Sequence, residues 1–150
     1  MPHERTEVSP EAIVRDVAVR AVTAVGLAGI ALIHLLDAIG KYSETPYLFW
    51  MYIALIGASL ITAGAVIFTR SRAPFLAAAA IATSALTGFV LSRTSGLPHA
   101  MDDIGNWTEP LGLASLFVEG VVATVAATAC GLAMRPWELG APLGTELNRR

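Results

Sequence analysis

The chain has 150 residues, of which 55% are hydrophobic and only 15% are charged, whereas about a quarter of the residues of a soluble domain are charged. This composition argues against an ordinary water-soluble fold. The net charge of −2, with dispersed Lys and Arg, gives no indication of nucleic-acid binding. The one cysteine, Cys130, excludes an intrachain disulfide and a cysteine-based metal site.

The apolar residues form four blocks, and each is long enough to cross a bilayer, since roughly 20 helical residues cover about 30 Å of hydrocarbon. The first helix is predicted to begin at Ser9-Pro10-Glu11, because Ser9 is a suitable N-cap and proline suits the first helical position. A polar turn is expected at 40–46 and a basic turn at 70–74. The predicted spans are residues 21–39, 47–69, 75–91 and 110–134, and the longest loop is 92–109.

The placement of the basic residues predicts the orientation of these spans. One side of the four-span topology collects Arg5, Arg15, Arg20, Arg70, Arg72, Arg135, Arg149 and Arg150, and the other side has only Lys41 and Arg93. By the positive-inside rule, both termini are expected in the cytoplasm and the 92–109 loop outside. Small residues occur in every span and favour close helix contacts. The sequence therefore predicts an all-α fold, a single-domain antiparallel four-helix transmembrane bundle over residues 1–150.

Ionisable residues inside the spans are the strongest indication of a site, because each is costly in hydrocarbon. His34 and Asp37 are three residues apart and share one face of the first helix. Glu119 lies about ten residues into the fourth helix, roughly 15 Å along its axis, with Ser115 on the same face. Arg93 ends the third span, and we expect it to pair with Glu119, Asp37 or Glu109.

Two interpretations of this cluster remain open. In the first, the charged residues neutralise one another and fix the register of the bundle. In the second, they form a site open to the outside that binds a cation or a small polar ligand, or relays a proton. The candidate metal ligands are His34, Asp37, His99, Asp102 and Asp103, with Glu109 and Glu119 nearby. This oxygen-rich set suits a divalent ion, but no recognised ligand spacing is present, so no cofactor is firmly implied.

The stretches Leu91–Pro98 (LSRTSGLP) and Asn106–Leu116 (NWTEPLGLASL), followed by Glu119, resemble a group of small, uncharacterised four-helix membrane proteins of bacteria. The resemblance implies the same fold and a location in the bacterial cytoplasmic membrane, and it carries no known activity. It also implies that Arg93, Trp107, Glu109 and Glu119 are shared positions. Trp107 is otherwise an interfacial anchor. The predicted ligand-binding residues are therefore His34, Asp37, Arg93, Trp107, Glu109 and Glu119.

The favoured hypothesis is a small binding or transport protein of the cell membrane, whose pocket faces outward near Arg93 and Glu119. The alternative is a non-catalytic accessory subunit of a larger membrane complex, in which the ion-pair network is purely structural. The expected partners are the lipid bilayer and either further copies of the chain or a larger membrane complex. An enzyme is the least favoured reading, because Ser92, Ser115 and Cys130 have no neighbouring base in the sequence.

Overall fold

The computed structural model describes residues 9–133 and contains four α-helices in this range. They are α1 (Pro10–Glu44), α2 (Pro46–Phe68), α3 (Ala73–Thr94) and α4 (Pro110–Ala133). All four are long and apolar enough to cross a membrane, which confirms the predicted all-helical class with four candidate spans. The predicted end of the fourth span at Met134 and the basic residues Arg5, Arg135, Arg149 and Arg150 lie outside the described residues.

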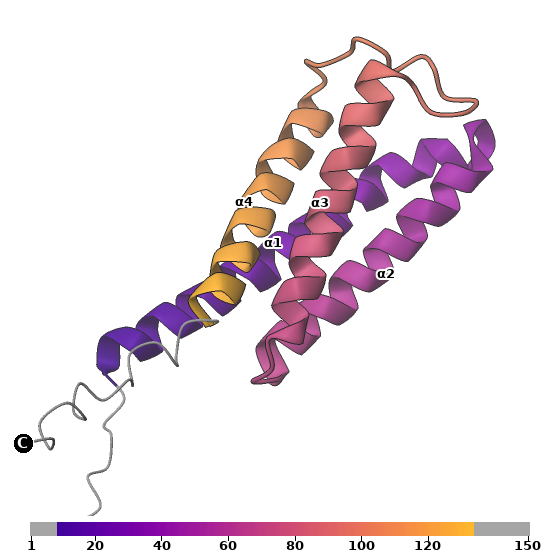
Figure 1. The fold of residues 1–150 in the computed structure, drawn as a ribbon. Coiled ribbons are helices and arrows are strands. Elements are labelled where there is room, and N and C mark those ends of the chain that lie inside the picture. Colours follow the sequence, from indigo (N-terminus) through magenta and orange to yellow (C-terminus); the bar gives the residue numbers. More distant parts are fainter. Residues whose placement is uncertain (1–8, 134–150) are drawn as a thin grey trace, which may run out of the picture.

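The connection between α1 and α2 is shorter than the expected polar turn at 40–46. Helix α1 continues through Gly40 and Lys41 to Glu44, and Thr45 alone separates it from α2. The break comes at Thr45 because the ring of Pro46 disfavours helical geometry in the residue before it. Thr45 has a ψ angle of 78° and its N–H still donates to the carbonyl of Lys41. Helix α1 is therefore one continuous helix of 35 residues, as Figure 1 shows.

The hydrophobic core lies toward the turn at residues 69–72 that joins α2 to α3. It contains side chains of all four helices: Leu27, Ile30, Val66, Phe75, Ala78, Ala82, Val122 and Ala126 are buried. Helices α1 and α4 approach closely because Gly26 has no side chain, and a Cβ at this position would overlap the side chain of Val122. Glycine at such contacts is typical of helix packing in membranes.

Arg20 joins three helices at this end of the bundle. Its Nη1 donates hydrogen bonds of 2.7 Å to the carbonyls of Val66 and Thr69, at the C-terminus of α2. Its Nε donates to Asp16 at 2.9 Å, and its guanidinium lies 5.6 Å from the ring centre of Phe75 on α3. The carbonyls that a helix end leaves without partners are thereby capped by a cation.

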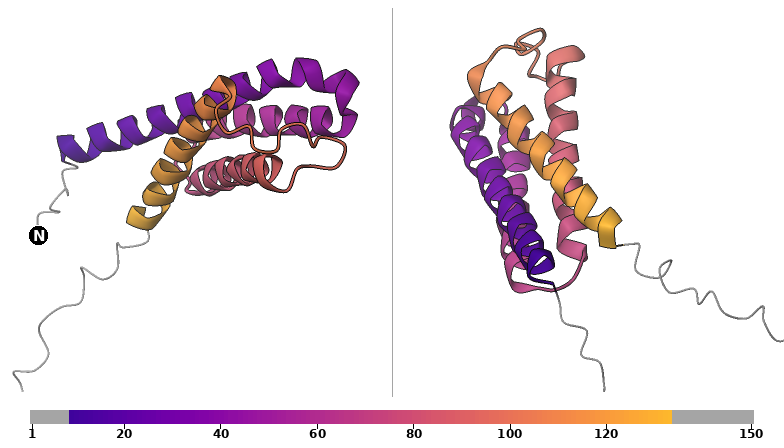
Figure 2. Two further views of the ribbon diagram at one scale, coloured as in Figure 1. Left: turned by 90° about the horizontal axis from the view of Figure 1, so that it is seen from above. Right: turned by 90° about the vertical axis from the view of Figure 1, so that its left-hand side faces the viewer.

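Helices α2 and α3 diverge from the 69–72 turn toward the loop 95–109 (Figure 1). The loop passes above this gap before the chain enters α4, and the first turns of α1 project beyond the other helices (Figure 2). Many large apolar side chains remain exposed on the helices, including Ile61, Phe68 and Phe117. These are the surfaces that hydrocarbon would cover if the helices cross a bilayer.

Candidate binding site

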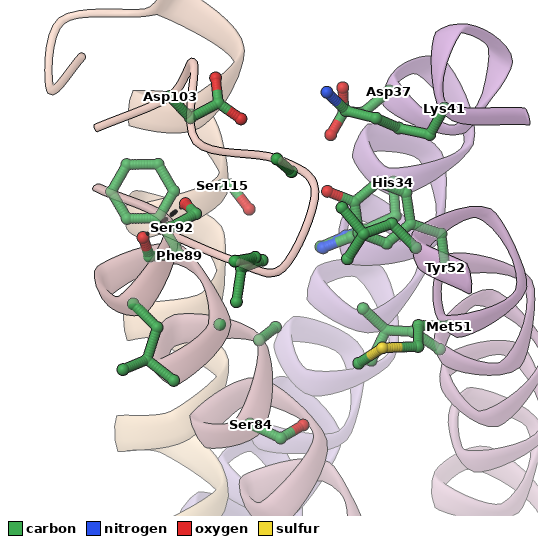
Figure 3. A pocket seen from close by; sticks show the side chains of 18 of the residues that line it. His34, Asp37, Lys41, Met51, Tyr52, Ser84, Phe89, Ser92, Asp103 and Ser115 are labelled. Carbon is green, nitrogen blue, oxygen red and sulfur yellow. Dashed lines mark hydrogen bonds between the residues drawn. The ribbon is translucent and has the colours of Figure 1, made fainter. Parts of the chain in front are cut away.

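A cavity of about 730 Å³ lies between the loop-side halves of α2 and α3, with α1 and α4 also contributing to its wall. Its deep part is apolar and is lined by Ile33, Leu55, Ala58, Ile81 and Ala85. Figure 3 shows Asp37, Lys41 and Asp103 at the loop end of the cavity, His34 and Ser115 below them, and Met51 and Ser84 deeper still. The cavity thus has a charged end and an apolar end.

The 95–109 loop covers the charged end of this cavity. Its segment at Pro98 is held by the hydroxyl of Tyr47 on α2, which donates a hydrogen bond of 2.7 Å to the Pro98 carbonyl. The loop turns at Gly96, which has a φ of 74° and leaves no room for a Cβ beside Met101 and Ile104. Only glycine adopts this backbone conformation without strain at such a crowded position.

Arg93, at the end of α3, organises the loop and is only 6% exposed. Its guanidinium forms an ion pair of 2.6 Å with Asp103 and a second ion pair with Glu109. Its main-chain carbonyl accepts a hydrogen bond of 2.9 Å from the N–H of Gly105. We call Arg93, Asp103 and Glu109 the roof cluster. One arginine with two carboxylates is a strong, directional arrangement, and it ties α3 to the loop and to the start of α4.

A second polar group, the mid-helix cluster, consists of His34 on α1 and Ser115 and Glu119 on α4. The hydroxyl of Ser115 donates to Glu119 Oε1 at 2.5 Å, and His34 Nε2 lies 3.8 Å from the same oxygen. Glu119 is 1% exposed. Among residues 9–133, its Oε2 has no hydrogen-bond partner. A buried carboxylate with an unpartnered oxygen is costly, and such groups occur mainly where they serve a function.

The orientation of the His34 ring is fixed from two sides. Its Nδ1 lies 2.9 Å from the carbonyl of Ile30, which can only accept a hydrogen bond, so Nδ1 carries the proton. The ring also packs edge-on against Tyr52 of α2, with ring centres 5.1 Å apart. Nε2 is therefore the nitrogen that faces Glu119. A proton shared by this pair resides either on the carboxyl group or on Nε2.

The cavity is open along the gap between α2 and α3. Met51 on α2 and Leu91 on α3 both line it, yet they are 60% and 44% exposed. Ala58 and Ser84, which lie further from the loop, also line the cavity and are exposed. Because exposed lining residues occur at several levels of both helices, and these helices diverge here (Figure 1), we infer a lateral opening between them, which we call the slot. On the loop side, the cavity is covered by the roof cluster and by the loop segment at Pro98 that Tyr47 holds.

The structure brings most of the predicted ligand-binding residues to this cavity. His34, Asp37, Arg93 and Glu109 line it. Glu119 does not, but it accepts a hydrogen bond from Ser115, which does. Arg93 pairs with Glu109, as one of the expected options, but the carboxylate beside His34 is Glu119 instead of Asp37.

Trp107 does not belong to the cavity wall and instead lies edge-on against Phe89, with ring centres 6.1 Å apart. Three titratable lining residues were not among the predicted site residues: Lys41, Tyr47 and Tyr52. Lys41 follows His34 and Asp37 at helical spacing, so the three residues share one face of α1. This pattern in the sequence predicts that Lys41 lies beside the other two. No comparable pattern marks Tyr52.

The candidate metal ligands do not converge. Among the residues from 9 to 133, no group of three or more His, Cys, Asp or Glu side chains is arranged to hold a metal ion. Asp103 is held by Arg93, while His99 and Asp102 are exposed and do not line the cavity. His34 and Asp37 line it but meet no third ligand. The chemistry of the cavity is that of charged and hydrogen-bonding groups above an apolar chamber.

No protein-family model, curated protein or solved structure matches this chain. The likeness to small bacterial four-helix membrane proteins therefore remains a prediction from the sequence. Functional inference depends on the site itself.

Proposed function

We propose that this protein binds a lipid-soluble organic molecule, which reaches the cavity from the bilayer through the slot between α2 and α3. The molecule has a polar head, placed near His34 and Ser115, and an apolar body in the deep part of the cavity. A volume of about 730 Å³ falls in the range of small-molecule sites. It is far larger than a bare ion requires, and the described residues offer no metal cluster.

The lateral slot is the observation that carries this proposal. Ala58 and Ser84 lie near the middle of two helices that are long and apolar enough to span a membrane. Both residues line the cavity and are exposed. In a membrane, this part of the slot faces hydrocarbon. A molecule dissolved in the bilayer can therefore enter without passing the 95–109 loop and the roof cluster. A water-soluble ligand would need a path through the loop.

The orientation inferred from the basic residues assigns the cavity to one leaflet. With an antiparallel bundle, both termini in the cytoplasm and the 95–109 loop outside, the slot opens to the outer leaflet of a bacterial cytoplasmic membrane. To test this orientation, Cys130→Ala/Asn106→Cys protein in intact cells is treated with a membrane-impermeant maleimide. The loop cysteine should be labelled without lysis, and labelling only after lysis would reverse the orientation.

Binding can be tested with phenylnaphthylamine, a neutral apolar dye whose fluorescence rises in dry sites. Wild-type protein in phosphatidylcholine nanodiscs should show a saturable signal above that of the lipid. Gly88→Leu should remove it, because Gly88 lines the cavity and a Cβ there meets no other atom, so the larger side chain has room to occupy the cavity. The lipid background is the same for both proteins.

Gly64→Leu is the matched control. Gly64 is also an intrahelical glycine with open space at its Cβ, but it does not line the cavity. This variant should bind the dye as the wild type does. Equal binding by wild-type and Gly88→Leu protein, or no saturable binding by either, would contradict the proposed function.

One observation favours the alternative of an accessory subunit or a homo-oligomer. Helix α3 exposes small side chains at Ala80, Thr83, Ser84 and Thr87, and small residues at a helix surface favour helix association in membranes. A helix of a partner or of a second copy could then cover the slot. Native mass spectrometry of the purified protein separates the two cases, since the alternative predicts a stoichiometric complex and the dye-binding proposal predicts an accessible monomer.

A further inference from the structure

We propose that the head group bound in this cavity is cationic, and that it binds in exchange for a proton held between His34 and Glu119. This inference rests on the proposed function and specifies the ligand as a lipophilic organic cation. It is carried by the charge of the cavity wall and by the geometry of the mid-helix cluster, which lies at the boundary between the polar and apolar parts.

Carboxylates outnumber cations around the cavity. Asp37, Asp103 and Glu109 line the cavity and Glu119 lies behind Ser115, which makes four carboxyl groups, whereas Lys41 and Arg93 are the two permanently cationic side chains of the wall. The Arg93 guanidinium is already shared by Asp103 and Glu109, and Lys41 also lies 3.6 Å from Glu44. The fully ionised site therefore carries an excess of negative charge. In low dielectric, such an excess attracts a cation or retains protons.

The mid-helix cluster offers two positions for one exchangeable proton. Because His34 Nδ1 is engaged with the Ile30 carbonyl, only Nε2 and the Glu119 carboxyl group can take up or release a proton within this pair. With one proton, the pair has no net charge. Without it, the pair leaves a buried negative charge, which is costly in hydrocarbon. A cationic head next to Ser115 and His34 offsets that charge, so the cation and the proton compete for one site.

The other charged side chains around the cavity do not offset a negative charge on the His34–Glu119 pair. The other titratable or charged side chains facing the cavity are Asp37 and Lys41 on α1, Tyr47 and Tyr52 on α2, Arg93 on α3, and Asp103 and Glu109 above. Arg93 is held at the roof, and the neutral Tyr52 ring covers one edge of His34. Glu119 Oε2 accepts no hydrogen bond from any residue of the described range. Glu119 does not itself line the cavity, so a cationic head acts on its charge across Ser115 and His34, which do line it.

The apolar chamber determines the rest of the ligand. Beyond Met51 and Ser84 the wall is formed by aliphatic side chains, so a strongly hydrated ion would lose its water without replacement. A cation with apolar substituents is weakly hydrated and gains from contact with this wall. Proton release from the His34–Glu119 pair and binding of such a cation conserve charge in the cavity.

The test uses two probes of the same size and opposite charge, tetraphenylphosphonium and tetraphenylborate. Each is added to wild-type protein in phosphatidylcholine nanodiscs that hold bound phenylnaphthylamine, and displacement of the dye is measured. Tetraphenylphosphonium should displace it at a concentration about tenfold or more below that of tetraphenylborate. Its affinity should rise by about tenfold per pH unit where the pair releases its proton, by linkage.

Glu119→Gln should bind the neutral dye normally but lose both the preference for the cation and the pH dependence. Glu11→Gln, an identical substitution at an exposed position at the start of α1, should change neither. If Glu119→Gln does not fold, His34→Gln must shift the pH at which the affinity for tetraphenylphosphonium rises, because the proton is then left with the Glu119 carboxyl group alone. An unchanged pH dependence in His34→Gln would contradict the exchange. Equal displacement by both probes, or a cation preference that survives in Glu119→Gln, overturns this inference while leaving dye binding intact. Failure of the dye to bind overturns the proposed function as well.

Discussion

The two polar clusters of this protein differ in how far their charged groups are paired within the chain. In the roof cluster, Arg93 has a carboxylate on each side and a loop amide on its carbonyl. In the mid-helix cluster, Glu119 has one hydroxyl donor and a histidine at 3.8 Å, and its second oxygen has no donor among the described residues. In the first cluster only Arg93 Nε is without a partner among the described residues and the charge is paired twice, whereas in the second cluster a carboxylate oxygen is without a donor and no permanent cation is paired with it.

This difference indicates which cluster stabilises the fold and which one is suited to bind a ligand. A charge that is paired and hydrogen-bonded stabilises its surroundings when it is present and destabilises them strongly when one partner is removed. A buried charge without such partners lowers stability, so its presence points to another role. The roof cluster is therefore expected to hold the loop and α4 in place, and the mid-helix cluster to interact with a ligand. Each prediction below tests one side of this comparison.

The largest effect on stability is expected for Arg93→Ala. It removes the cation from two carboxylates and releases the loop, so the free energy of unfolding should fall by about 3 kcal/mol. Denaturant unfolding in detergent measures this value. Arg93→Lys keeps the charge without the fork of donors and should lose less. A loss below about 1 kcal/mol for Arg93→Ala would show that the roof cluster is not structural.

A smaller effect is expected for Gly112→Ala, which changes the packing beside Phe89 and Arg93. A Cβ at Gly112 would lie 2.6 Å from the Phe89 ring and 3.4 Å from the Arg93 guanidinium. The Phe89 ring, which packs against the Arg93 guanidinium, would have to shift, at a cost of about 1–3 kcal/mol. Gly120→Ala in the same helix meets no atom within 4 Å and should stabilise slightly through helix propensity. Equal unfolding midpoints for the two variants would exclude tight packing at Gly112.

Tyr47→Phe should cost about 1 kcal/mol, because it removes the single hydrogen bond from α2 to the loop at Pro98. The effect should be local. Hydrogen exchange of the loop amides should become faster, while exchange in the core helices stays unchanged. Tyr42→Phe is the comparison, since the Tyr42 hydroxyl is exposed and makes no hydrogen bond within residues 9–133. Unchanged loop exchange in Tyr47→Phe would show that the roof is held without this contact.

The smallest effect on stability is expected for Glu119→Gln. Glutamine keeps an acceptor for the Ser115 hydroxyl and removes a buried charge that has no permanent cation beside it. The free energy of unfolding should therefore stay within about 1 kcal/mol of wild type, or increase. Thermal unfolding of the two proteins in the same detergent gives the comparison. A loss as large as that of Arg93→Ala would place Glu119 among the structural ion pairs.

The sequence predicted the four spans because each contains about 20 apolar residues bounded by turn residues and charges. It also identified Glu119 and Arg93, since ionisable residues near or within apolar blocks are conspicuous. It misjudged the length of α1, because Gly40 and Lys41 are common in turns and also occur in helices, and only Pro46 enforces the end.

The partners within the site were harder to predict. His34 and Asp37 share a helix face, so sequence spacing suggested that they touch, but the packing of α1 against α4 gives His34 a different carboxylate, Glu119. The lateral slot had no sequence signal, because it arises from the divergence of α2 and α3 (Figure 1). Spacing along one helix predicts which residues share a face, and only tertiary packing determines which faces meet.

The most direct test of the account measures two properties of Glu119→Gln in the same nanodiscs: its unfolding temperature and its displacement of bound phenylnaphthylamine by tetraphenylphosphonium. The account predicts an unfolding temperature equal to or above that of wild type, normal dye binding, and loss of the cation's advantage over tetraphenylborate. A large drop in unfolding temperature with an unaltered preference for the cation would contradict it, and would make the mid-helix cluster a structural element of the bundle.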